Sequence, residues 1–141
     1  MGDKKYVVRN DLLRTVAPMP VFAGEKNFNP HYLIIKLSKQ YRFHPVNQCF
    51  CLVEYQPDGM TANIWKQYVN SPRSFAELRR AIMEVPGLTW QYQLKNIVHY
   101  CSSSQIAGNR NYIRESPRKL LTVLCTPAGW ALTGYIRRRS L

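Results

Sequence analysis

The sequence predicts a single α+β domain in which two or three helices pack on a central antiparallel sheet. The chain has 141 residues, of which 45% are apolar and 12% aromatic, as is typical of one globular domain. Two runs rich in β-forming residues, 48–56 and 60–69, flank the turn letters QPDG and predict a hairpin (48–69) at the heart of the sheet. The run 73–85 has the amphipathic spacing of a helix that packs on such a sheet.

The N-terminal third is expected to contribute a strand and a helix. Residues 4–9 resemble a short first strand, and a proline-rich connection follows. A helix is expected over 30–42, because Pro30 suits the first helical position. The apolar face of this helix would consist of Leu33, Leu37 and Tyr41. A strand through 32–37 is the alternative.

The middle of the chain carries the two clearest patterns. In the first strand of the hairpin, alternate residues share a face, and one face would hold Cys49, Cys51, Val53 and Tyr55. In the helix over 73–85, Ser74 and Glu77 have the spacing of a capping box. The apolar stripe of that helix would consist of Phe75, Leu78, Ile82 and Val85.

The C-terminal part is expected to hold a strand, a loop and a buried apolar segment. Residues 88–95 alternate between apolar and polar side chains, which favours a strand, and 96–101 could continue it or turn helical. Residues 102–119 are polar and predict a flexible basic loop. Residues 120–136 carry no charge, but they are short for a spanning helix and contain glycine and proline, so we expect a buried hairpin or helix pair. Residues 137–141 would form a basic C-terminal tail.

Charge is the main clue to function. The chain has 20 Lys and Arg against 8 Asp and Glu, so its formal net charge is +12. A field this positive attracts polyanions: nucleic acid first, then an anionic membrane surface or an acidic protein. Half of the net charge lies in 102–141, where seven basic residues stand against Glu115 alone.

Arginines beside aromatic residues predict a nucleic-acid surface. Guanidinium groups bind phosphate bidentately, and exposed aromatic rings stack on single-stranded bases. The predicted binding residues are Arg110, Tyr112, Arg114, Arg118, Lys119, Arg137, Arg138 and Arg139, with Arg79 and Arg80 on a second basic face. The alternative is that these arginines only keep the surface solvated.

The cysteines and histidines allow one metal hypothesis. If the letters CFC and HYC lay on neighbouring strands, Cys49, Cys51, His99 and Cys101 could form a zinc site, with His44 as a substitute ligand. Their spacing differs from that of zinc knuckles and ribbons, and free cysteine packs well in protein cores. We therefore expect no cofactor, with zinc as the second possibility.

The sequence predicts a non-enzymatic protein that binds single-stranded or structured RNA or DNA, mainly through the phosphate backbone. Clustered carboxylates and a glycine-rich phosphate loop are not recognisable, so an enzyme is less expected. The alternative is a small basic subunit or inhibitor that docks on an acidic protein, with 120–136 as its interface. The first 25 residues lack a secretory signal, so we expect an intracellular protein with reduced cysteines.

Overall fold

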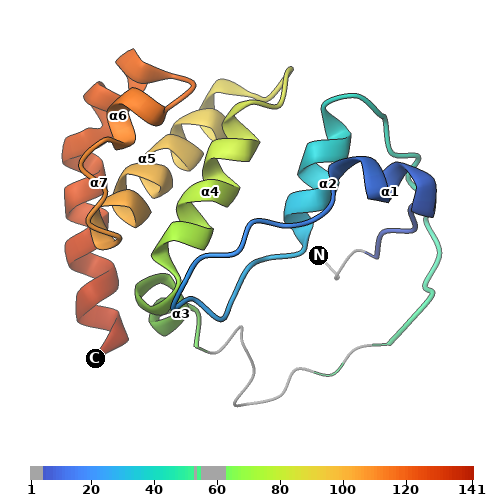
Figure 1. The fold of residues 1–141 in the computed structure, drawn as a ribbon, viewed down its shortest axis with the longest axis horizontal. Coiled ribbons are helices and arrows are strands. Elements are labelled where there is room, and N and C mark those ends of the chain that lie inside the picture. Colours follow the sequence, from blue (N-terminus) through green and yellow to red (C-terminus); the bar gives the residue numbers. More distant parts are fainter. Residues whose placement is uncertain (1–4, 53, 55–62) are drawn as a thin grey trace.

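The predicted α+β class is wrong, because the chain folds as a set of packed helices (Figure 1). The computed structural model describes residues 5–52, 54 and 63–141, and within these ranges no residue forms a strand. The helices are α1 (Asn10–Val16), α2 (His31–Ser38), α3 (Ile64–Asn70), α4 (Pro72–Met83), α5 (Trp90–Ile106), α6 (Tyr112–Glu115) and α7 (Lys119–Ser140).

Three helices form the body of the molecule. Helices α4, α5 and α7 lie side by side, with α5 in the middle (Figure 1). Helix α3 packs against α7 near the C-terminus, and α6 packs against α7 near its other end. Helix α2 packs on α4, and α1 lies against α2. Among the described helices, none packs on the remaining long face of α7.

The core lies between α4 and its neighbours. Leu78 and Ile82 of α4 pack against Tyr32 and Ile35 of α2. A second cluster connects α3, α4 and α7 through the buried side chains of Tyr68, Phe75 and Ile136. A third cluster connects α4, α5 and α6, and its buried members are Met83, Ile97, Tyr100, Cys101 and Tyr112. The helices predicted over 30–42 and 73–85 are thus confirmed as α2 and α4, although α2 is shorter than expected.

The predicted capping box at the start of α4 is wrong. The carboxylate of Glu25, which precedes α2, accepts hydrogen bonds from the backbone N–H groups of Arg73 and Ser74, each at 2.8 Å. It also accepts a bond of 2.6 Å from the Ser74 hydroxyl. Glu77 is bonded to Arg80 instead. The first N–H groups of a helix have no partner within the helix, so a carboxylate at this end is stabilising.

The predicted hairpin over 48–69 is wrong as well. Residues 48–52 have no regular secondary structure and are exposed, while the turn letters QPDG lie outside the described residues. Residues 64–69 of the second predicted strand belong to α3. This segment is helical because Trp65, Tyr68 and Val69 recur at helical spacing and pack toward α4 and α7.

The strand predicted over 88–95 is also wrong, because α5 begins at Trp90. Trp90 and Tyr92 are exposed, so the alternation of large side chains there has no buried face. The buried stripe of α5 lies further along the chain at helical spacing; it includes Ile97, Tyr100, Cys101 and Ser104. Residues 5–9 are extended and likewise pair with no described strand.

The basic loop predicted over 102–119, the apolar hairpin or helix pair over 120–136 and the tail over 137–141 are replaced by the end of α5, the short helix α6 and the long helix α7. Within 102–119, α5 continues to Ile106 and α6 follows, so only short turns remain. Residues 120–136 form neither a hairpin nor a helix pair, because α7 runs through them and through the arginines beyond, with Pro127 inside it. In the described part of the chain, no helix combines the length and hydropathy needed to cross a membrane.

Candidate docking surface on the last helix

Helix α7 turns several of its small residues toward α5. Gly129 lies so close to α5 that a Cβ atom on it would sit 2.5 Å from the Cβ of Cys101. The Thr133 hydroxyl lies 3.0 Å from the hydroxyl of Ser102 on α5, and Thr122 is fully buried. Small side chains let the two helix backbones approach closely. This contact determines which face of α7 turns outward.

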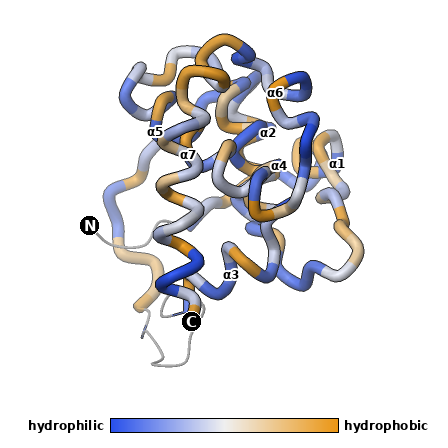
Figure 2. The backbone as a smooth tube through the Cα atoms, turned by 90° about the vertical axis from the view of Figure 1, so that its left-hand side faces the viewer, coloured by the Kyte–Doolittle hydropathy of each residue, from blue (hydrophilic) through white to orange (hydrophobic). Residues whose placement is uncertain are grey.

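The outward face of α7 is apolar. Leu120 is 83% exposed, Leu124 75% and Trp130 65%. We call this face the outer ridge; its exposed residues are Leu120, Val123, Leu124, Pro127, Trp130, Ala131 and Tyr135. Figure 2 looks onto α7 from this side. A contiguous exposed apolar surface of this kind marks an interaction site in a folded protein.

Both ends of the outer ridge are basic. Arg118 and Lys119 stand at its start and Arg137–Arg139 at its end, all exposed. Arg110 and Arg114 are exposed in the α6 corner beside the start of α7. Among the described residues, no acid forms an ion pair with any of these side chains. With a rise of about 1.5 Å per residue, the two basic ends lie about 28 Å apart.

Aromatic rings accompany the C-terminal basic end. The Trp65 ring meets the Tyr135 ring edge-on at 5.3 Å between centroids, and the Arg139 guanidinium lies 5.6 Å from the Tyr135 centroid. The predicted proximity of arginine and an exposed aromatic ring is therefore present here. The start of α7 differs, because Leu120 and Leu124 dominate its exposed surface.

Two of the predicted binding residues make contacts inside the fold instead. Tyr112 is buried, and its hydroxyl lies 2.9 Å from that of Thr126 on α7. The Arg79 guanidinium donates to the Asn96 side-chain oxygen at 2.9 Å and to the Tyr68 hydroxyl at 3.1 Å. These contacts join α3, α4, α5, α6 and α7.

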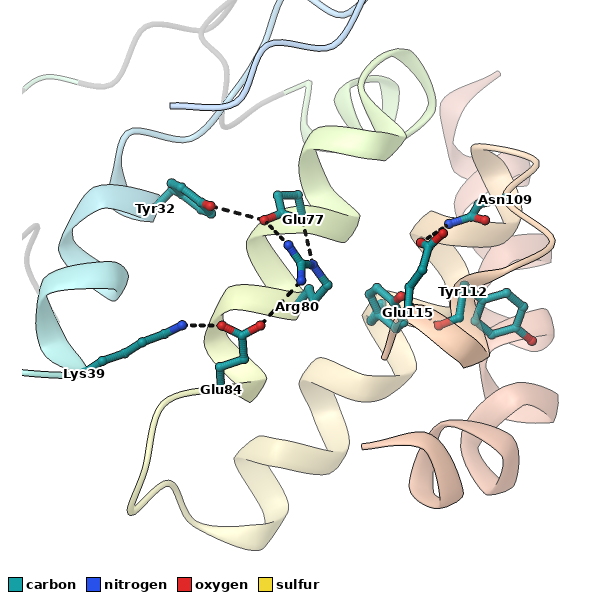
Figure 3. Close-up of polar contacts among 9 residues, drawn as sticks. Tyr32, Lys39, Glu77, Arg80, Glu84, Asn109, Tyr112 and Glu115 are labelled. Atoms are coloured by element: carbon teal, nitrogen blue, oxygen red, sulfur yellow. Dashed lines mark hydrogen bonds and ion pairs between the residues drawn. The ribbon is translucent and has the colours of Figure 1, made fainter. Parts of the chain in front are cut away.

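Arg80 belongs to a polar bridge between α2 and α4 (Figure 3). Its guanidinium donates two hydrogen bonds of 2.8 Å to Glu77 and lies 3.5 Å from the Glu84 carboxylate. Lys39, directly after α2, pairs with Glu84, and the Tyr32 hydroxyl of α2 donates to Glu77 at 3.1 Å. Burial and the Glu77 charge raise the pKa of Tyr32 to about 12, so its phenol remains a donor.

The residues of the zinc hypothesis do not converge. Cys49 and Cys51 are exposed in the extended segment after α2. His99 and Cys101 lie two positions apart on α5, and successive helical residues turn by about 100°, so their side chains diverge. Burial, and then the charge of Arg79, lower the pKa of His99 to about 4. In the described ranges, no three His, Cys, Asp or Glu side chains are grouped to hold a metal ion.

Sequence reasoning preferred to place the uncharged stretch 120–136 in the core and gave it as an interface only in the alternative, so it did not identify which side chains of α7 are exposed. A signal was present in the small residues, which recur at intervals of four, three and four positions: Thr122, Thr126, Gly129 and Thr133. That spacing is typical of a helix face packed closely on another helix. It leaves the leucines and Trp130 on the opposite side.

The outer ridge offers alkyl, indole, phenol and guanidinium groups, which can make apolar, hydrogen-bonding and ionic contacts. The thiol of Cys125, partly buried on α7, has its pKa raised by burial, which makes it a poor nucleophile at neutral pH. Comparisons with protein-family models, curated proteins and solved structures found no match.

Proposed function

We propose that this protein is a non-enzymatic interaction protein that docks on an acidic protein through the outer ridge of α7. The placement of side chains on α7 carries the proposal: Thr122 and Gly129 are buried against the fold, whereas the larger apolar residues Leu120, Leu124 and Trp130 are exposed. Fully burying one leucine-sized side chain is worth about 1.5–3 kcal/mol. Covering Leu120, Leu124 and Trp130 would therefore contribute several such increments to binding.

The charges at both ends of the ridge select the partner. A second copy of this chain is a poor occupant, because parallel or antiparallel pairing along the ridge would bring basic ends together. An acidic protein meets both ends favourably. The matching surface would be apolar over about 25 Å and carry carboxylates at each end. Such an apolar centre with a charged rim is the usual anatomy of a specific protein interface.

The test first captures the binding partner and then measures the affinity of the two purified proteins for each other. The full-length protein is used as bait in a nuclease-treated extract, and the acidic protein recovered is purified and titrated. We expect Leu124→Ser to weaken binding at least tenfold. We expect the triple change of Arg137, Arg138 and Arg139 to Gln to weaken binding and flatten its salt dependence. Arg14→Gln on α1 is the matched control, because this exposed arginine lies away from the ridge.

Three results would contradict the proposal. One is equal affinity of the Leu124→Ser variant and the parent protein. Another is a dimer in sedimentation that Leu124→Ser converts to a monomer, which would show a second copy on the ridge. The third is binding to anionic lipid vesicles that depends on Leu124, with no protein partner bound.

Nucleic-acid binding is the second candidate, and the arginine–aromatic cluster at the C-terminal end of α7 favours it. Tyr135 and Arg139 lie together there, as in surfaces that stack bases and hold phosphates. The ridge is less suitable, because a phosphate backbone finds no charged partner along it. Titration of labelled single-stranded RNA and DNA in a salt series, with heparin as competitor, separates the two functions. A steep salt slope that the arginine triple variant reduces and Leu124→Ser leaves unchanged would favour nucleic acid.

A further inference from the structure

A cleft of about 330 Å³ opens between α4, the second half of α5 and α6, away from the outer ridge. Its volume is at the small end of the range for ligand-binding pockets. Its polar lining includes Arg73, Glu77, Arg80, Tyr100, Ser104 and Glu115. Figure 3 shows this region, with Glu77 and Arg80 on α4 and Glu115 at the end of α6.

The buried part of the cleft lining carries two hydroxyl groups. The Tyr100 hydroxyl donates a hydrogen bond of 2.8 Å to the backbone carbonyl of Tyr112. Burial, and then the charge of Glu115, raise the pKa of Tyr100 to about 12, so the phenol keeps its proton. Ser104 is fully buried, and its hydroxyl lies near that of Tyr100 without a hydrogen bond of normal geometry to any described residue.

Two opposite charges in the cleft have no ion-pair partner among the described residues. Arg73 is exposed, and its guanidinium forms no ion pair with any residue that the structure describes. Glu115 accepts a hydrogen bond of 2.8 Å from the Asn109 side chain, and no cation of the described chain pairs with it. Arg80 differs, because Glu77 and Glu84 already hold it.

We propose that this cleft binds a small zwitterion of amino-acid size, with its anionic group on Arg73 and its cationic group on Glu115. The lining carries two guanidinium and two carboxylate groups, so a ligand with one charge alone would meet repulsion from one of the pairs. A ligand with both charges meets two complementary partners. Phe22 at the same cleft offers apolar contact to a short methylene chain between the charged groups.

The test is a titration of the full chain, followed by NMR at the backbone amides of Ala107, Gly108 and Asn109, which line the cleft. The probes are ω-amino acids of increasing length, from glycine to aminooctanoate, with hexanoate and hexylamine as singly charged analogues. We expect saturable shifts at these amides, with one zwitterion bound at least tenfold more tightly than either analogue. Binding that is no tighter for any zwitterion, or no shift at these amides, would overturn the proposal.

Variants decide whether the two charges are the contacts. Arg73→Gln and Glu115→Gln should each weaken the best zwitterion at least tenfold, while the amide in Glu115→Gln still accepts the bond from Asn109. Arg110→Gln is the control, because this exposed arginine is close in sequence but does not line the cleft. Unchanged affinity in both cleft variants would refute the assignment. Leu124→Ser should leave zwitterion binding unchanged, so this test is independent of the docking function.

Discussion

Replacing Gly129 by alanine tests the contact that turns the outer ridge to the surface. A Cβ atom at this position would lie 2.5 Å from the Cβ of Cys101 and 3.3 Å from the backbone nitrogen of Ser102. Carbon atoms in contact normally lie about 3.5–4.0 Å apart, so α5 and α7 must separate by about 1 Å. No rotamer change can relieve this clash, because the obstructing atoms belong to the backbone or are attached to it.

The expected loss of stability follows from two opposing effects. Overpacking of a close contact costs about 1–3 kcal/mol, and the fixed obstacle at Cys101 places Gly129→Ala near the upper end. Alanine also favours the helix over glycine by about 1 kcal/mol. The net loss should be about 1–2 kcal/mol, which lowers the melting temperature of a chain this long by about 3–6 °C.

Gly134→Ala is the matched control in the same helix. A Cβ there meets no atom within 4 Å, so only the gain in helix preference remains, and this variant should be stabilised by about 1 kcal/mol. Urea and thermal unfolding followed by circular dichroism measure both variants. If Gly129→Ala proved as stable as Gly134→Ala, the close approach of α5 and α7 described above would be refuted.

Three further perturbations probe other parts of the fold. Glu25→Ala should destabilise the protein by about 1–2 kcal/mol in urea unfolding, because three hydrogen bonds at the start of α4 are lost; an unchanged midpoint would contradict that capping role. The pKa of His99 is about 4 in the fold against a usual value of 6.5, so the unfolded chain binds more protons between these values. The contribution of neutral His99 to the free energy of unfolding should therefore be fully present above pH 6.5 and fall by about 2 kcal/mol toward pH 4, after allowance for partial exposure of the ring. The His99→Gln variant should not show this decline in stability, and a variant that still shows it would disprove the assignment to His99. Arg79→Met should destabilise the fold at every pH, because Asn96 and Tyr68 lose a charged donor, whereas full stability would show that these bonds contribute nothing.

The sequence predicts helices well where one apolar stripe is enough to define them. In α4, Phe75, Leu78 and Ile82 recur on a single face against polar neighbours, and the structure buries them as expected. In α3, the pattern misleads, because Trp65, Tyr68 and Val69 are all good strand formers. Their helical conformation is favoured by packing against Phe75 of α4, which follows α3 directly, and against Ile136 of α7, far along the chain.

The candidate site could be predicted only in its chemistry. Arg118 and Arg137–Arg139 are positively charged in any fold, so their attraction for an acidic ligand could be predicted from the residue types alone. The structure places all four on the surface. Their separation follows from α7 being one uninterrupted helix, which the glycines and Pro127 argue against in sequence. The cleft at Arg73 and Glu115 joins segments more than 40 positions apart, and no local pattern brings them together.

Pro127 changes the hydrogen bonding of the backbone under the outer ridge. Proline has no N–H group, so the carbonyl of Val123 cannot receive the usual helical hydrogen bond from the residue four positions later. Val123 is half-exposed on the ridge, so we expect this carbonyl to offer an acceptor beside the apolar side chains. A proposed partner that slid along the ridge would keep its apolar contacts but lose a donor aligned with that carbonyl. We therefore expect Pro127 to favour one register of a bound surface over the others.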